Sequence, residues 1–318
     1  NFQGQSLGPA EVIVIAAAMS TNTSVAEVNV SLNNIGTDGA KALGEAIPDS
    51  SLQWVVIGAT STRVPVHNSE LASLKFQGQS LGPAEVIVLA AAMSTNPSIV
   101  SINCFANNFG EDGLSTLLAA IKGTSVRSLC GLTEGQTVAD FSGQNLGPID
   151  CKIMAAEFAF QGFIASIASL KLDSNGIFGE LYSNGNVKEA DKFVTEVQPL
   201  LDALKTSSIT SLSLRGTGMG VKGVAAVADA MSKMASVASI SLSGNMITGS
   251  TDIGLSYAKY DLDLSGIIAF GEAAAVSKTT LQFGSQEWLM KRAIEPMADA
   301  SMTISLLILK KYTGLFSP

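Results

Sequence analysis

The residues whose spacing most resembles a chemical motif are three glycines, Gly218, Gly220 and Gly223, which form GxGxxG between a strand-like LSLR and a helix-like stretch. In dinucleotide-binding folds, glycines at this spacing let the backbone approach a pyrophosphate at the N-terminus of a helix. Two of the three recur in another segment of the chain, at Gly36 and Gly39. Because this pair recurs at a strand-to-helix turn, we interpret the glycines as structural and expect no nucleotide cofactor.

Other residue types that carry catalysis or bind metals are sparse. The single histidine, His67, lies in the irregular stretch VPVHNSE without a histidine or cysteine nearby, so we interpret it as a loop residue. The cysteines are too few and too far apart for a disulfide framework or a zinc site, which favours a reducing, intracellular compartment. The chain also lacks Walker A, GxSxG and HExxH motifs. The sequence therefore predicts a protein that is not an enzyme and has no cofactor.

The elements that hold these residues belong to a repeat. The stretch from Phe76 to Ser94 recurs almost unchanged from Phe2 to Ser20 and more loosely from Phe141 onward. Residues 1–25 and 75–99 differ only at positions 1/75, 15/89, 23/97 and 25/99, and the larger repeat starts near residues 1, 75 and 140. A weaker version of the same motif follows each copy about 28 residues later. The smallest repeat unit is therefore one strand, one turn and one helix.

One repeat unit can be interpreted residue by residue. Leu74 and Phe76 alternate with polar residues, as in a strand with one buried face. Gln79 follows where the chain must turn, and its amide can satisfy backbone groups at the bend. Pro83 and Glu85 then suit the first turn of a helix, because proline fits its first position and an acid favours its dipole.

The same frame begins at Val28, Ile102, Leu170, Leu212 and Ile240, and weaker versions begin at Val55, Leu129, Leu262, Leu281 and Leu306. This L-x-L-x-x-N-x-I-G frame, followed by a helix of the GAKALGEAI type, resembles the leucine-rich repeat, specifically its ribonuclease-inhibitor-like subtype. The resemblance implies an α/β solenoid, or horseshoe, with parallel strands on the concave face and helices on the convex face. It also implies a ladder of turn amides at Asn33, Gln79, Asn107, Gln144, Asn175 and Asn245. We expect residues 1–318 to form a single solenoid, with some irregular units, that is a piece of a longer array.

Three stretches depart from the frame. The stretch between Val55 and Leu74 contains Pro65 and lacks a helical period, which indicates a short unit or an excursion. The stretch SLCGLTEGQTVADFSG predicts a strand, a tight turn around Thr133–Gln136 and a return strand. Between Leu170 and Leu212 the chain carries an insertion of about 14 residues, best placed at 180–189, and inserted loops of solenoids are often functional.

The amino-acid composition restricts the classes of partner that the protein can bind. Only 14% of residues are charged and 47% are hydrophobic, so either part of the exterior meets another protein or alanine and glycine inflate the apolar share. Residues 1–150 hold 5 Lys+Arg and 12 Asp+Glu, which suits a basic partner and gives no basic face for nucleic acid. The longest apolar runs are too short for a membrane span, which needs about 20 residues.

The resemblance implies that residues between and just after the apolar strand positions face the concave side. The candidate interaction surface comprises Lys75, Gln77, Asn103, Phe105, Asp140, Lys171, Asp173 and Arg215. Phe105 is the large aromatic among them, either an interface anchor or a residue rotated inward. We expect a non-catalytic protein-binding scaffold, of which a structural subunit of a larger assembly is one form, that binds around Phe105 and 180–189. An alternative interface is a docking face on the convex helices. The alternative functions are a soluble enzyme regulator of the inhibitor or GTPase-activator type and the ligand-sensing region of a receptor.

Overall fold

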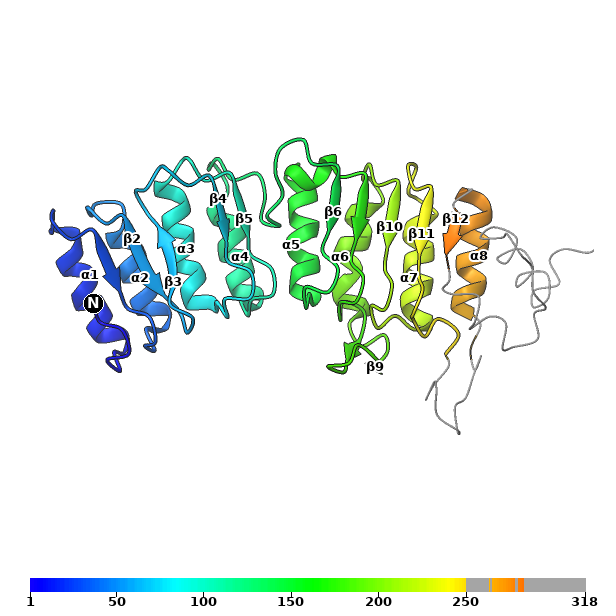
Figure 1. Cartoon of the computed structure of the whole chain (residues 1–318), viewed down its shortest axis with the longest axis horizontal. Coiled ribbons are helices and arrows are strands. Elements are labelled where there is room, and N and C mark those ends of the chain that lie inside the picture. The colour runs from blue at the N-terminus through cyan, green and yellow to red at the C-terminus, as the bar shows by residue number, and fades with distance from the viewer. Residues whose placement is uncertain (250–262, 264, 278–279, 283–318) are drawn as a thin grey trace, which may run out of the picture. The chain divides into compact units, whose positions relative to one another are not determined.

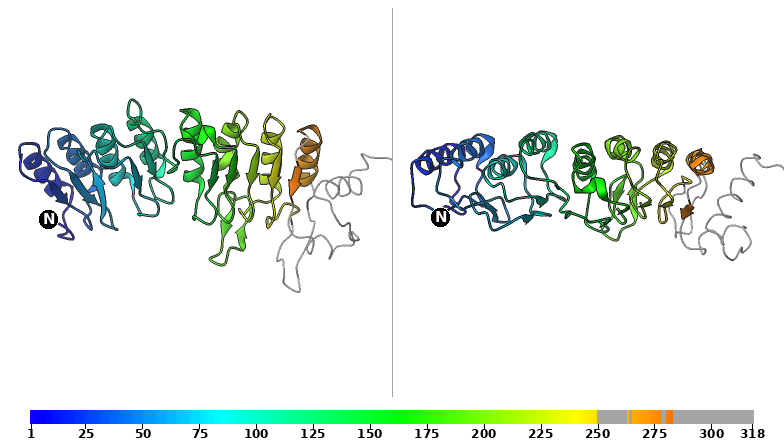
Figure 2. Two further views of the ribbon diagram at one scale, coloured as in Figure 1. Left: turned by 45° about the horizontal axis from the view of Figure 1, so that its top comes forward. Right: turned by 90° about the horizontal axis from the view of Figure 1, so that it is seen from above.

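The computed structural model describes residues 1–249, 263, 265–277 and 280–282 (Figure 1). The backbone divides into two compact bodies. The N-terminal body comprises Asn1–Glu134 with Phe160–Ile164, and the C-terminal body comprises Gly135–Ala159 with the described residues from Ala165 onward. Within each body the helices form one layer and the strands another (Figure 2). The alternating helices and parallel strands confirm the α/β class, while the continuity of the two bodies as one solenoid stays a prediction.

The N-terminal body is built from α1 (Pro9–Ser20), β1 (Glu27–Asn29), α2 (Gly36–Ala46), β2 (Trp54–Ile57), β3 (Thr62–Pro65), β4 (Ser73–Lys75), α3 (Pro83–Thr95), β5 (Ser101–Asn103) and α4 (Gly110–Ala120). Strand β1 pairs in parallel with β2, and β4 pairs in parallel with β5. The helices pack in chain order, α1 on α2, α2 on α3 and α3 on α4.

The C-terminal body is built from β6 (Val138–Asp140), α5 (Pro148–Ala159), β7 (Ser169–Lys171), β8 (Glu180–Leu181), β9 (Val187–Glu189), α6 (Val194–Leu204), β10 (Ser211–Ser213), α7 (Val221–Met231), β11 (Ser239–Ser241), α8 (Ser265–Ser277) and β12 (Thr280–Gln282). A 3₁₀ turn at Phe163–Ser166, which contains residues of both bodies, follows α5. Five of the strands form a parallel sheet in the order β12-β11-β10-β7-β6. Helices α5 to α8 pack in chain order.

The sequence explains where a repeat unit begins its helix. In α3, Pro83 takes the first helical position, where its missing N–H costs nothing. The N–H of Gly82 donates to Oε2 of Glu85 at 2.9 Å, so the acid satisfies a backbone donor that the helix leaves unpaired. Leu74 and Phe76 of the preceding strand are buried. The strand-to-helix step therefore follows from local chemistry and one apolar face.

Of the predictions for two irregular stretches, the structure agrees with one and contradicts the other. The excursion after Val55 is a hairpin, in which β3 returns antiparallel to β2. The prediction of a return strand after Thr133–Gln136 is wrong. The strand that follows this turn, β6, pairs in parallel with β7 instead of folding back antiparallel. The edge of β5 is instead satisfied by the chain from Ser128, since the N–H of Ile102 donates to the Ser128 carbonyl at 2.8 Å.

The C-terminal frame is described only in part. Leu281 lies in β12, opposite Ile240 of β11. Helix α8 begins at Ser265. Leu262 and Leu306 themselves lie outside the described residues.

Candidate interaction surface

The turn after β5 is held by one asparagine side chain. Asn107 is only 9% exposed. Its Nδ2 donates to the carbonyls of Cys104 (2.9 Å) in its own repeat unit and Phe76 (2.8 Å) in the preceding one. Its Oδ1 accepts the N–H of Leu81, also in the preceding unit, at 3.0 Å. A single amide thus satisfies backbone groups of two neighbouring units.

The turn positions fall into two classes. Asn33, Asn175 and Asn245 repeat the Asn107 pattern, each donating to its own unit and to the preceding one and each accepting a backbone N–H from the latter. The two glutamines differ from them. Oε1 of Gln79 accepts the Thr62 hydroxyl at 3.3 Å, and Nε2 of Gln144 donates to the Asp140 carbonyl of its own strand. The ladder contacts are therefore made by the four asparagines, each of which closes the turn of the preceding unit, whereas Gln79 makes a different contact.

Four of the predicted surface residues come together in the C-terminal body. Asp140 of β6 pairs in register with Lys171 of β7, which pairs with Ser213 of β10. Asp173 and Arg215 follow two residues after these strand positions. Asp140, Lys171 and Arg215 are exposed and Asp173 is half-buried. These five residues, called here the strand face, form a polar row on the side of the sheet away from α5 to α7.

The strand face is pre-organised by its own contacts. Nζ of Lys171 lies 3.2 Å from Oδ2 of Asp140. Hydrogen bonds from Ser142, followed by the contact with Lys171, lower the pKa of Asp140 below its ordinary value. Oδ1 of Asp173 accepts both the Ser213 hydroxyl at 2.6 Å and the Arg215 N–H at 2.9 Å. The acids are thus engaged, whereas the Arg215 guanidinium makes no ion pair with any residue that the structure describes.

The other four predicted residues lie in the N-terminal body. Lys75 is exposed on β4, opposite Asn103 of β5, and Nδ2 of Asn103 donates to Oε1 of Gln77 at 3.1 Å. Phe105 is 0% exposed, so its expected role as the exposed anchor at the centre of the interface is wrong. The chain enters a left-handed turn at Ala106 (φ +54°), and the ring is buried at the turn. Burying a phenyl side chain stabilises the folded chain by about 1.5–3 kcal/mol, which favours the inward position of the ring.

A second cluster on the N-terminal body was not predicted from the sequence. The guanidinium of Arg63 on β3 lies 3.8 Å from the ring centroid of Trp54 on β2 and 2.7 Å from Glu27 on β1. Arginine and tryptophan are the residue types most enriched at binding hot spots. The sequence alone does not indicate this cluster, because only the antiparallel return of β3 brings Arg63 beside Trp54.

The insertion at 180–189 is a β hairpin, β8 paired antiparallel with β9, and Tyr182 is 54% exposed in its turn. Glu180 binds Lys188 at 2.5 Å and Lys192 at 2.6 Å. These hydrogen bonds hold the pKa of Glu180 down to about 2. The hairpin is therefore an ordered projection that carries both charge and an exposed aromatic ring.

The residue that ends the hairpin explains the GxGxxG motif. Oδ1 of Asp191 accepts the N–H groups of Gly220 at 2.7 Å and Gly223 at 2.9 Å, and Oδ2 accepts that of Lys222 at 2.7 Å. Backbone N–H groups at a helix N-terminus are the groups that would bind a phosphate. In this chain they are already engaged by a carboxylate from the inserted hairpin.

The extra glycine of the motif has a packing role. Gly218 has φ +76°, and a Cβ at this residue would lie 2.7 Å from Cα of Gly179. Its carbonyl accepts the Asp191 N–H at 3.1 Å. Gly218 is therefore required where the hairpin approaches the turn, in keeping with a structural interpretation of the motif.

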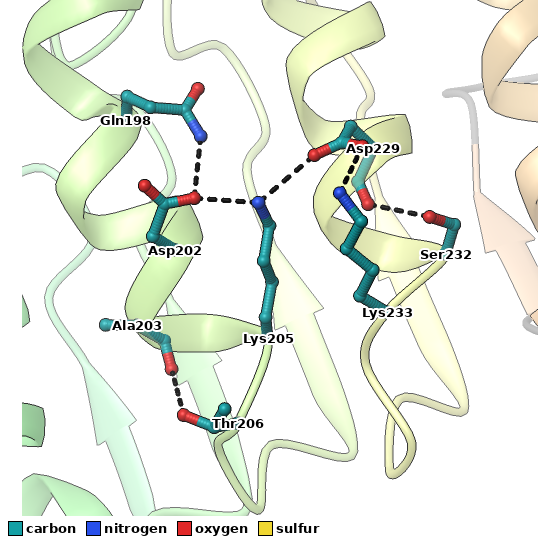
Figure 3. Close-up of polar contacts among 8 residues, drawn as sticks. All are labelled: Gln198, Asp202, Ala203, Lys205, Thr206, Asp229, Ser232 and Lys233. Atoms are coloured by element: carbon teal, nitrogen blue, oxygen red, sulfur yellow. Dashed lines mark hydrogen bonds and ion pairs between the residues drawn. The ribbon is translucent and has the colours of Figure 1, made fainter.

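The helix layer of the C-terminal body carries a separate ion-pair network (Figure 3). Nζ of Lys205 lies between Asp202 of α6 (2.7 Å) and Asp229 of α7 (3.1 Å), and Asp229 also binds Lys233 at 2.7 Å. The two aspartates are more than half exposed, so solvent screens these pairs. The network neutralises charge on the helices and links α6 to α7.

The described residues offer little for other chemistry. Cys104, Cys130 and Cys151 are all buried, and burial raises the pKa of the Cys151 thiol. Nε2 of His67 lies 3.0 Å from the Ile47 carbonyl. Within the described part of the chain there is no group of three or more His, Cys, Asp or Glu placed to hold a metal ion. No helix in that part is both long and apolar enough to cross a bilayer.

A match to a family model agrees with the repeated geometry. A family model described as Leucine Rich repeat matches residues 21–44, which include β1, the Asn33 turn and most of α2. The leucine-rich repeat-containing protein LegL7 from Legionella pneumophila, a crystal structure, shares 19% identity over 95% of each chain, with a TM-score of 0.28. No match was found among curated proteins.

Stacked strand–turn–helix units with bridging asparagines define a repeat protein of the solenoid class. The unit matched at residues 21–44 has the same turn bonds as the units of Asn107, Asn175 and Asn245, so the leucine-rich repeat recurs along the chain. The chain is therefore a protein-interaction repeat domain, of a family that is typically non-catalytic. The ribonuclease-inhibitor-like subtype stays a prediction.

Proposed function

We propose that this protein is a non-catalytic scaffold that binds a protein partner through the strand face, as a structural subunit of a larger assembly. The observation that carries the proposal is the row of exposed Asp140, Lys171 and Arg215 and half-buried Asp173 along neighbouring strands. The side chains of Asp140, Lys171 and Asp173 are held by internal hydrogen bonds and an ion pair, so binding there orders few side chains and loses little entropy. Arg215, whose guanidinium has no ion pair among the described residues, is the anchor for a carboxylate of the partner.

The hairpin with exposed Tyr182 extends this surface, since it projects from the same body and its ion pairs hold it in one conformation. The acidic first half of the chain adds long-range attraction for a basic partner, and that attraction weakens with salt. By contrast, the helix layer around Lys205 has its charges paired with each other.

A photo-crosslinking amino acid at Ser142, which is exposed beside Asp140, tests the placement. In the organism's own cells we expect one discrete adduct that is lost with Arg215→Glu and kept with Lys222→Glu, the matched charge reversal at the start of α7. The same crosslinker at Asp202 on the helix layer should give no adduct. An adduct from Asp202 alone would move the interface to the helices and refute the strand face.

Behaviour in isolation separates a subunit from a soluble regulator. A permanent subunit purified alone aggregates or copurifies with its partners, because its partner-facing surface is uncovered. A regulator sediments as a soluble monomer at all concentrations. Sedimentation velocity of the purified chain therefore decides between the two roles without knowledge of the partner.

A further inference from the structure

The chain contains two nearly identical helices in different surroundings. Helices α1 (PAEVIVIAAAMS) and α3 (PAEVIVLAAAMST) differ within their shared length only at position 15/89. Val88 of α3 is 0% exposed, but Val14, its counterpart in α1, is 70% exposed. Because the sequences match, α3 shows which surroundings this helix accommodates on every side.

Each of the two helices has one side that receives a glycine from the following helix. A Cβ at Gly39 of α2 would lie 3.1 Å from Cβ of Val12 in α1, and a Cβ at Gly113 of α4 would lie 3.5 Å from Cα of Pro83 in α3. This side is therefore covered in the same way in both copies, by the next repeat unit.

The opposite side is covered only in α3. A Cβ at Gly44 of α2 would lie 3.4 Å from Cβ of Ala91 and 3.8 Å from Cγ2 of Ile87. The counterparts of Ile87 and Ala91 in α1 are Ile13 and Ala17, and both are exposed. With Val14 they form the outer face of α1, an apolar row shaped for a helix that carries a glycine or alanine.

Polar groups at the end of the same face point to the same kind of partner. Nδ2 of Asn96, just after α3, donates to the Asn68 carbonyl of the preceding unit at 2.6 Å. Its counterpart, Asn22, uses Oδ1 to accept the N–H groups of Ser24 and Val25. The Nδ2 of Asn22 has no acceptor among the described residues.

We propose that the outer face of α1, with Asn22, docks one further helix–strand repeat unit of the kind formed by residues 36–68. That unit presents a small residue at the Gly44 position against Ile13 and Ala17, and a loop carbonyl to Asn22. The only charged residue of α1 is Glu11, whose carboxylate accepts the Gly8 N–H. The face therefore selects an apolar, small-residue helix and offers no salt bridge to a charged one.

The test extends the full chain by placing a copy of residues 27–74 directly before Asn1, which recreates the junction that precedes Lys75. We expect the backbone amides of α1 to exchange with deuterium roughly tenfold more slowly than in the unextended chain, approaching the rates of α3. Gly44→Leu in the added unit should abolish the protection.

Two point variants make the test specific. Val14→Arg should remove the protection in the extended chain and leave the unextended chain unchanged, because Val14 is exposed there. Ser115→Arg, which adds the same charge at an exposed position of α4, should change neither. Unchanged exchange on extension, or equal effects of Val14→Arg in both chains, overturns the proposal. So does a dimer of the unextended chain that Val14→Arg dissociates, since the face would then bind a second copy.

Discussion

Replacing Asp191 with asparagine removes one negative charge at the N-terminus of α7 and changes little else. Asparagine keeps the Oδ1 acceptor for Gly220 and Gly223, and it tolerates the positive φ of +60° at this position. Its NH₂ group, however, replaces the Oδ2 acceptor and faces the N–H of Lys222. Two donors then oppose each other where a charged hydrogen bond of 2.7 Å had been.

The expected loss of stability follows from these contacts. Removing an anion from a helix N-terminus costs about 0.3–1 kcal/mol, and up to about 2 kcal/mol in partly buried sites. Losing one hydrogen bond adds about 0.5–1.5 kcal/mol. The free energy of unfolding should therefore fall by about 1–3 kcal/mol, and the charge-dependent share should shrink as salt is added.

Urea unfolding and deuterium exchange over residues 218–231 measure the effect. The matched control is Asp202→Asn on α6, an exposed ion pair with Lys205 that contributes no more than about 1 kcal/mol. Faster exchange at the start of α7 in Asp191→Asn alone supports the assignment. Equal losses in the two variants, or unchanged exchange at 220–224, would refute the view that Asp191 fills the anion site.

Three further predictions follow from the same contacts. Asn107→Ala should lower the free energy of unfolding by about 1–3 kcal/mol, because buried backbone groups lose their partner, while Gln79→Ala should cost clearly less in the same urea melts; equal costs would contradict the two classes of turn. Calorimetry should detect no NAD binding, and saturable binding abolished by Gly218→Val would restore the nucleotide hypothesis. In a pH titration followed by carboxyl NMR, Glu180 should have its midpoint near pH 2 rather than 4.5. The stability from its ion pairs is therefore complete above pH 4.5 and is lost as pH falls through about 2. A midpoint near 4.5 would show that the pairs do not persist in solution.

The sequence predicted what depends on local chemistry. Leu74, Phe76 and Pro83 locate a strand and a helix start because alternation, burial and the fixed φ of proline act over a few residues. The asparagine frame likewise located the turns, since the side chain must sit at one position to reach two neighbouring backbones. Dismissing the GxGxxG motif required only comparison with a second copy of the same turn.

The remainder depended on contacts between residues far apart in the chain. Phe105 occupies a position that is polar in the neighbouring units, and nothing in its local sequence indicates that the ring is buried. Asp191 lies 29 residues before Gly220, so its capping role needs the hairpin to fold back onto α7. Gln79 has the right chemistry for the ladder but bonds with a threonine from the β2–β3 excursion.

The asparagine bridges all run in one direction along the chain. Asn33 reaches back to Phe2 and Leu7, Asn107 to Phe76 and Leu81, and Asn175 to Phe141 and Leu146. In each of these three units the turn is therefore completed by an asparagine of the following unit. An array held in this way has polarity: deleting a later unit leaves backbone groups of the unit before it without their partner, whereas deleting an earlier unit leaves only an asparagine side chain without its contacts to that unit. Fraying should consequently advance from the C-terminal side of each body toward its beginning.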